Sequence, residues 1–142
     1  MANAVYPLYK TAILSAGTNT SLTVDTVDDG PFVSLVDTDT YTYSSAHQFY
    51  NSLTGIVGTD QRITVPTVGA VAAGTFDGAN VTFTAVAGTV SVEALVITRH
   101  NVGANTTWRL VLYEDTAVTG LPVTTNGGDI SISWSASGIL LI

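Results

Sequence analysis

Apolar and polar residues alternate along much of this chain. Between residues 129 and 135, Ile130, Ile132 and Trp134 fall on one face, while serines occupy the other. Such period-two alternation, bounded by Gly, Asn and Asp, is typical of short β-strands. We therefore expect eight strands, near residues 20–24, 31–37, 61–65, 80–86, 90–98, 107–114, 129–135 and 139–142.

Two stretches have helical rather than strand spacing. Aromatic and aliphatic residues recur at helical intervals in 5–14, where Pro7 restricts any helix to begin near that residue. In 44–53, a serine precedes a turn that carries apolar residues, which predicts a second short helix. Together these patterns predict an all-β fold, a β-sandwich or jelly-roll-like double sheet with one or two short helices.

The length of 142 residues fits a single β domain that covers residues 1–142. Within it we expect residues 1–18 to form an N-terminal arm. Residues 54–76 are expected to form a variable loop or arm. Part of this segment, 66–76, is small and apolar, and a weak strand there is the alternative.

The strands expected at 90–98 and 107–114 are apolar on both faces. Such strands are covered on both sides in folded proteins. The second cover must be the N-terminal segment, a helix, or another subunit, and the pattern leaves these choices open. The apolar stretch Ile139–Ile142 favours a partner, because chain ends are usually polar and frayed.

Charged residues are scarce, and this changes the expected partners. The chain is 46% hydrophobic and only 11% charged, against about 25% charged in an average domain. A surface built from Thr, Ser, Asn and Gly resists association weakly, so assembly with other chains is expected.

The net charge of −7, with four Lys and Arg residues in total, excludes nucleic acid and acidic membrane surfaces as partners. No stretch approaches the roughly 20 apolar residues of a membrane span. The absence of cysteine excludes disulfides and thiolate chemistry. The first residues lack the features of a signal peptide, so synthesis in the cytosol is expected.

No motif for catalysis or metal binding stands out. His47 and His100 lie in no recognised ligand spacing. Asp37-Thr38-Asp39 resembles the start of a calcium loop but lacks its later ligands, so a solvated turn is expected. We expect no metal and no cofactor.

Three carboxylates are candidates for acid–base chemistry, namely Glu93, Glu114 and Asp115. The last two directly follow an apolar strand, where charged residues commonly mark its exit to solvent. We therefore expect a protein that is not an enzyme.

Two arginines, Arg99 and Arg109, flank the loop between the two apolar strands. We expect them to pair with Glu93 or Glu114 across the sheet, or with acidic groups of a partner. Aromatic residues in exposed-looking segments are typical anchors of an interface, and core packing is their alternative role. The candidate interface residues are Tyr6, Tyr9, Tyr41, Tyr43, Phe49, Arg99, Arg109, Ile139, Leu140, Leu141 and Ile142.

Three phrases carry a resemblance to a known family: VSLVDTDTYTYSSAHQF (33–49), GTFDGANVTFTAVAGTVSVEALVI (74–97) and LPVTTNGGDISISW (121–134). In this order they resemble small virion proteins of tailed bacteriophages. The resemblance spans nearly the whole chain, and the segment 54–76 departs from it.

The resemblance implies a structural protein of the phage particle. The favoured role is a capsid cement (decoration) protein on the outer capsid surface, made in the host bacterial cytoplasm. It would bridge neighbouring subunits of the major capsid protein and associate with itself as a dimer or trimer. The alternatives are a tail, neck or baseplate component, or a carbohydrate- or receptor-binding β module.

Overall fold

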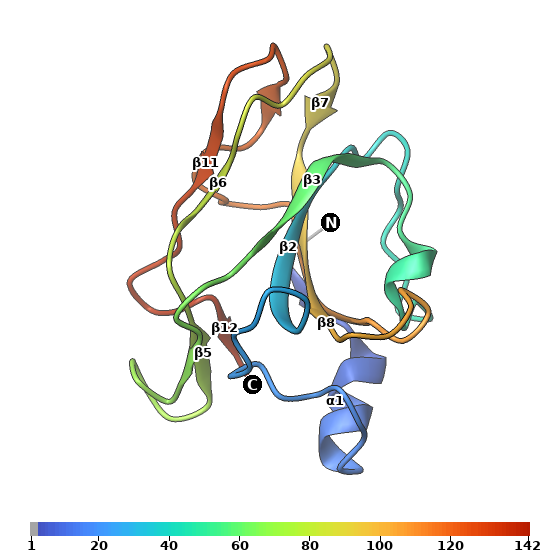
Figure 1. The fold of residues 1–142 in the computed structure, drawn as a ribbon, viewed down its shortest axis with the longest axis vertical. Coiled ribbons are helices and arrows are strands. Elements are labelled where there is room, and N and C mark those ends of the chain that lie inside the picture. The colour runs from blue at the N-terminus through green and yellow to red at the C-terminus, as the bar shows by residue number, and fades with distance from the viewer. Residues whose placement is uncertain (1–2) are drawn as a thin grey trace.

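Five antiparallel strands form the largest sheet of the computed structural model, which describes residues 3–142 (Figure 1). The strands lie in the order β1-β9-β8-β2-β3. They comprise β1 (Ala4–Val5), β9 (Arg109–Glu114), β8 (Ala94–His100), β2 (Gly30–Val36) and β3 (Ile56–Arg62).

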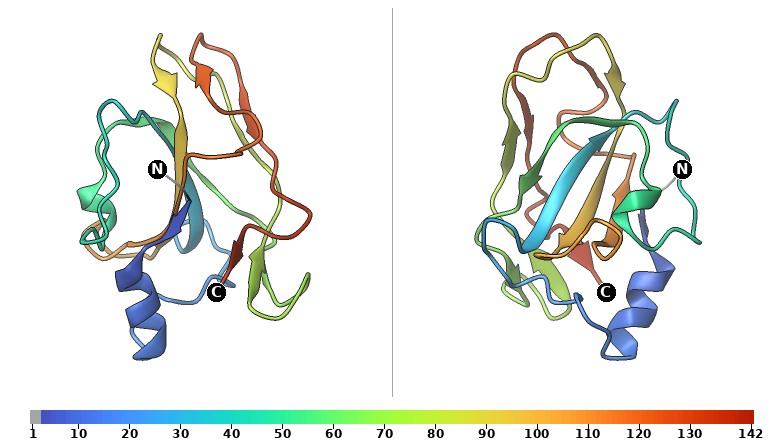
Figure 2. Two further views of the ribbon diagram at one scale, coloured as in Figure 1. Left: turned by 180° about the vertical axis from the view of Figure 1, so that it is seen from behind. Right: turned by 45° about the vertical axis from the view of Figure 1, so that its right-hand side comes forward.

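Shorter strands form a second layer. β5, β6, β11 and β12 lie on one side of the large sheet, which confirms the predicted all-β, double-sheet class (Figures 1 and 2). These smaller sheets have the orders β12-β5-β4, β11-β6 and β10-β7. Their strands are β4 (Thr67–Val68), β5 (Thr75–Asp77), β6 (Val81–Phe83), β7 (Ser91–Val92), β10 (Val123–Thr124), β11 (Ile130–Ile132) and β12 (Leu140–Leu141).

The opposite side of the large sheet is covered by the connection between β2 and β3, residues 37–55 (Figure 2). Helix α1 (Pro7–Leu14) packs beside β9. Every residue of β8 is buried within this single chain. The apolar pattern on both faces of β8 is therefore satisfied internally and does not require a partner subunit.

Two β-bulges in the large sheet change the direction in which side chains point. Ile97 pairs with Leu112 and Thr98 with Leu110, so Val111 is an extra residue in β9. The register between β2 and β3 also shifts, since residues 58–60 of β3 lie opposite the single residue Ser34 of β2. Such bulges bend a strand and redirect its side chains, and the second of them positions Asp60.

The helix expected from 5–14 is confirmed as α1, and it begins at Pro7. Of the second helical stretch expected at 44–53, only Tyr50–Ser52 is helical, as the short 3-10 helix η1. Phe49 instead makes a β-bridge with Arg109. Pairing with β9 therefore holds this part of the segment extended.

Several expected boundaries are also corrected. Residues 20–24 contain no strand, and the strand expected at 61–65 is β3, which begins earlier at Ile56. The expected arm 54–76 thus contains β3 and β4 and reaches β5. The expected arm 1–18 contains β1 and α1, while its residues 1–2 lie outside the described residues. Within the described part of the chain, no helix is long and apolar enough to cross a membrane.

Burial in the core predicts how two leucines respond to the same truncation. Leu95 in β8 is 0% exposed and Leu14 in α1 is 89% exposed. Leu95→Ala should lower the free energy of unfolding by about 2–5 kcal/mol, since it leaves a cavity. Leu14→Ala should change it by less than about 0.5 kcal/mol. Urea unfolding of both variants measures the difference, and equal losses would contradict this packing.

Candidate functional site

The structure places three of the expected interface aromatics in the core. Tyr6, Tyr9 and Tyr41 are 0–2% exposed. The Tyr6 and Tyr41 hydroxyls lie 2.8 Å apart, and the Tyr9 hydroxyl donates to the Thr20 carbonyl at 2.7 Å. A tyrosine with a satisfied hydroxyl is readily buried. These three side chains are therefore packed in the hydrophobic core.

The other two candidate aromatic residues, Tyr43 and Phe49, are half-buried. The Tyr43 ring lies 5.1 Å from that of Tyr6 and 5.3 Å from that of Tyr113, measured between centroids. The Tyr41 hydroxyl also meets His47 Nδ1 at 2.9 Å. Burial raises the pKa values of Tyr6 and Tyr41. The phenols stay protonated at neutral pH, and their role is structural.

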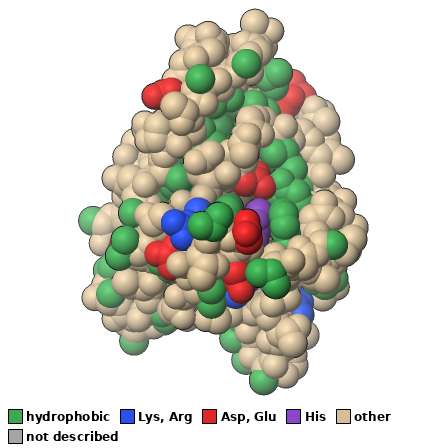
Figure 3. All heavy atoms as spheres, in the orientation of Figure 1, with side chains coloured by type: hydrophobic (Ala, Val, Ile, Leu, Met, Phe, Trp, Pro, Cys, Tyr) green, Lys and Arg blue, Asp and Glu red, His purple; other side chains and the backbone are tan. Residues whose placement is uncertain are grey.

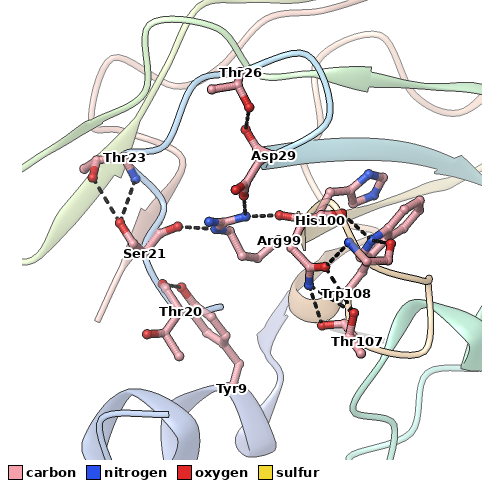
Figure 4. A network of polar contacts seen from close by, with 12 residues as sticks. Tyr9, Thr20, Ser21, Thr23, Thr26, Asp29, Arg99, His100, Thr107 and Trp108 are labelled. Atoms are coloured by element: carbon pink, nitrogen blue, oxygen red, sulfur yellow. Dashed lines mark hydrogen bonds and ion pairs between the residues drawn. The ribbon is translucent and has the colours of Figure 1, made fainter. Parts of the chain in front are cut away.

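Arg99 ties the loop before β2 to β8 (Figure 4). Its guanidinium contacts the carboxylate of Asp29 and donates to the carbonyls of Ser21 and His100. The expected pairing with Glu93 or Glu114 is therefore wrong for Arg99. The reason is that the 20–29 segment folds over this end of β8 and supplies acceptors locally.

Arg109 also has internal partners. Its Nε donates to the Thr18 carbonyl at 2.7 Å, and its Cζ lies 5.5 Å from the centroid of the Phe49 ring. Arg109 and Phe49, both predicted as interface residues, are thus brought together by their β-bridge. Neither expected carboxylate partner contacts Arg109 among the ion pairs of residues 3–142.

The candidate acid–base carboxylates have separate neighbours. Glu93 accepts a hydrogen bond from the Thr38 N–H at 3.0 Å. Burial raises the pKa of Glu114 to about 6, and that side chain lines a different hollow with Asn3 and Thr116.

The expected turn at Asp37-Thr38-Asp39 is present. Asp37 Oδ1 accepts from the Asp39 N–H at 2.9 Å, and Asp37 Oδ2 accepts from the Thr40 hydroxyl at 3.2 Å. Within residues 3–142, no group of three or more His, Cys, Asp or Glu side chains is arranged to hold a metal ion.

A cavity of about 570 Å³ opens where β2, β3 and β8 meet the loop before β9. The space-filling view shows a histidine side chain between acidic side chains in a hollow of this face (Figure 3). The bulge in β3 places a carboxylate in the wall. The rings and carboxylates that line the cavity are Phe32, Tyr50, His100, Trp108, Asp28 and Asp60.

His100 is stacked between two aromatic rings in this wall. The His100 ring centroid lies 4.1 Å from that of Phe32 and 3.8 Å from that of Trp108. Tyr50 meets His100 edge-on at 5.5 Å. The Trp108 indole N–H donates to the Asn101 carbonyl at 2.9 Å, which fixes that ring.

Burial controls protonation in the cavity wall. It lowers the pKa of His100 to about 4, with a smaller contribution from the Arg99 charge. Burial raises the pKa of Asp60, while the hydrogen bond from the Tyr50 hydroxyl, at 2.5 Å, opposes this rise. His100 Nε2 and Asp60 Oδ2 lie 3.9 Å apart. At neutral pH they are not an ion pair, because His100 is uncharged.

Four buried polar atoms around this wall have no hydrogen-bond partner among the described residues. They are Ser34 Oγ, Asp60 Oδ1, Thr98 Oγ1 and His100 Nε2. Buried polar groups are normally paired, and each exception needs a reason. Two of the four belong to side chains that line the cavity.

A second hollow, of about 530 Å³, is an apolar groove beside β12. No charged residue lines it, and its walls include Tyr9, Ile13, Leu22, Val68, Phe76 and Ile142. β12 is the outer strand of its sheet, with β5 as its strand neighbour. The expected apolar stretch is split here, since Ile139 and Leu140 are buried while Leu141 and Ile142 are 67% and 57% exposed.

Sequence reasoning missed the cavity. It assigned His100 no role, and it placed Asp60 in a variable arm. Phe32, Tyr50 and Trp108 are separated by long stretches of chain, and no spacing rule connects them. The available signal was a histidine at the end of an apolar strand, with a tryptophan eight residues later.

The hydroxyl chain of the tyrosine cluster generates a stability prediction. Tyr41→Phe removes the bond to Tyr6 and the bond to His47. It should lower the free energy of unfolding by about 1–3 kcal/mol, because a buried partner loses its bond. Tyr43→Phe is the control, since the Tyr43 hydroxyl makes no hydrogen bond within residues 3–142. An equal effect of both changes in urea unfolding would contradict the role of the hydroxyl chain.

His100 generates a pH prediction. Between pH 6.5 and about 4 the unfolded chain protonates this residue and the folded chain does not. Stability must therefore fall as pH falls. From pH 7.5 to pH 5 the His100 contribution is about 2 kcal/mol of lost stability. The raised pKa values of Asp60 and Glu114 act in the opposite direction, so the comparison must use variants.

His100→Phe or His100→Gln should lose about 2 kcal/mol less than the parent chain over this pH interval. His47→Gln is the matched control. Urea unfolding at both pH values measures the difference, and parallel pH profiles for the parent and both His100 variants would refute the assignment.

Scans of the chain against protein-family models, curated proteins and solved structures found no match.

Proposed function

We propose that this chain is a non-enzymatic structural protein of a tailed-bacteriophage virion. Its role would be that of a capsid decoration protein, which binds the outer shell and bridges neighbouring major capsid subunits. The resemblance of its sequence phrases motivates the virion assignment. The apolar groove beside β12 is the single structural observation that supports attachment to another protein.

The groove suits an extended, uncharged and apolar segment of the shell protein. β12 is an edge strand, and edge strands accept an added strand through backbone hydrogen bonds. Val68 and Ile142, each 57% exposed, would contact the side chains of that segment. Because no charged side chain is among the described residues that line the groove, docking there carries no cost for burying a charged side chain of this chain.

Multivalency would give such attachment its strength. A single groove offers limited area, and area alone does not determine affinity. A chain that engages neighbouring subunits gains effective concentration at its second contact. Separating the subunits would then require both contacts to break, which is how a decoration protein resists the pressure of packaged DNA.

The groove generates a binding prediction. Val68→Ser and Ile142→Ser should each weaken binding to purified expanded shells by roughly tenfold, because each removes about 1–2 kcal/mol of apolar burial. Val90→Ser is the control, since Val90 is also exposed but lies outside the groove. Co-sedimentation with shells measures binding, and analytical ultracentrifugation measures self-association.

Unchanged shell binding by both groove variants would refute this docking mode. Loss of self-association with shell binding intact would assign the groove to a second copy of the chain. Labelled protein over the whole head of virions would support decoration. Label confined to one vertex would instead support a tail, neck or baseplate component.

A further inference from the structure

The cavity beside His100 has a strongly biased electrostatic character. Asp28, which is exposed, and Asp60, which is mostly buried, both line it. No lysine or arginine is among its lining residues. The nearby Arg62 forms an ion pair with Asp25, with 2.9 Å between a guanidinium nitrogen and Oδ1. In a chain with a net charge of −7, such a hollow attracts cations and repels anions.

A second and independent feature points to a ligand with N–H donors. The His100 side chain is only 6% exposed and lines the cavity, yet its Nε2 has no partner in the described chain. Burial keeps His100 uncharged at neutral pH, and a neutral imidazole has one ring nitrogen that can accept a hydrogen bond. Asp60 Oδ1 is a second buried acceptor without a hydrogen-bond partner among residues 3–142.

The remaining walls suit the same chemistry. Phe32, Tyr50 and Trp108 also line the cavity, and aromatic rings attract ammonium and guanidinium groups. The volume of about 570 Å³ lies within the range of small-ligand sites. Anionic ligands would meet two carboxylates and no lysine or arginine among the lining residues.

We propose that this cavity binds an organic cation, an ammonium or guanidinium group, through Asp28, Asp60 and the aromatic rings around them. The cation belongs either to a free amine or to a Lys or Arg side chain of another protein. This site is separate from the groove beside β12, and it stands whether or not the chain decorates a capsid.

The test uses the full chain with Trp134→Phe, so that Trp108 is the only tryptophan and reports on the cavity. Fluorescence titration and calorimetry would follow binding of agmatine and of a blocked Gly-Arg-Gly peptide. The citrulline peptide is the neutral isostere, and N-acetylglutamate is the anionic control. If agmatine binds and the arginine peptide does not, the ligand is a free amine. If the arginine peptide binds equally well, the ligand is a protein side chain.

Matched charge variants locate the site. Asp28→Asn and Asp60→Asn should each weaken binding by about tenfold or more, the loss expected for a hydrogen bond to a charged group. Asp39→Asn removes the same charge from an exposed position elsewhere and should leave binding unchanged. Because Asp28 is exposed, its variant should fold normally even if Asp60→Asn is destabilised.

Three results would overturn the proposal. One is no saturable binding of either cation into the millimolar range. Another is equal binding of the arginine and citrulline peptides. The third is binding of a neutral saccharide, with no cation binding, that Asp28→Asn leaves intact. That result would assign the cavity to sugars.

Discussion

Strand β8 is buried along its whole length, and the rest of the fold is arranged to keep water from both of its faces. Short strands of the second layer cover one face, and residues 37–55 cover the other (Figure 2). Apolar burial is the main favourable contribution to folding. A strand with two apolar faces therefore requires two covers, and this chain supplies both.

The last two residues of β8, Arg99 and His100, have different surroundings. Arg99 and His100 are consecutive, so their side chains leave the strand on opposite faces. The Arg99 guanidinium holds the 20–29 segment against β8, because it donates hydrogen bonds to the Asp29 carboxylate and the Ser21 carbonyl. His100 is enclosed by aromatic rings and stays uncharged near neutral pH. One side of the strand end thus organises a loop, while the other forms the wall of a cavity.

The two candidate binding surfaces differ in chemistry. The groove beside β12 is apolar and uncharged, and it suits an extended polypeptide. The cavity beside His100 is acidic and aromatic, and it suits a cation. The scarce cations of the chain are largely engaged internally, as Arg99, Arg62 and Arg109 illustrate. The exposed charge is consequently mostly negative, which fits the proposed cation site.

The single strand expected at 90–98 is divided into β7 and β8, which belong to different sheets. The sequence by itself determined the β class, the strands β2 and β9, and the start of α1 at Pro7. These features follow from local alternation and from a fixed backbone angle, which neighbouring residues alone control. Only the tertiary structure decided that Tyr6 and Tyr41 are core residues, that β3 begins at Ile56, and that Asp60 faces His100. Each of these depends on pairing and burial against residues far away in the chain, for which a single sequence carries no local signal.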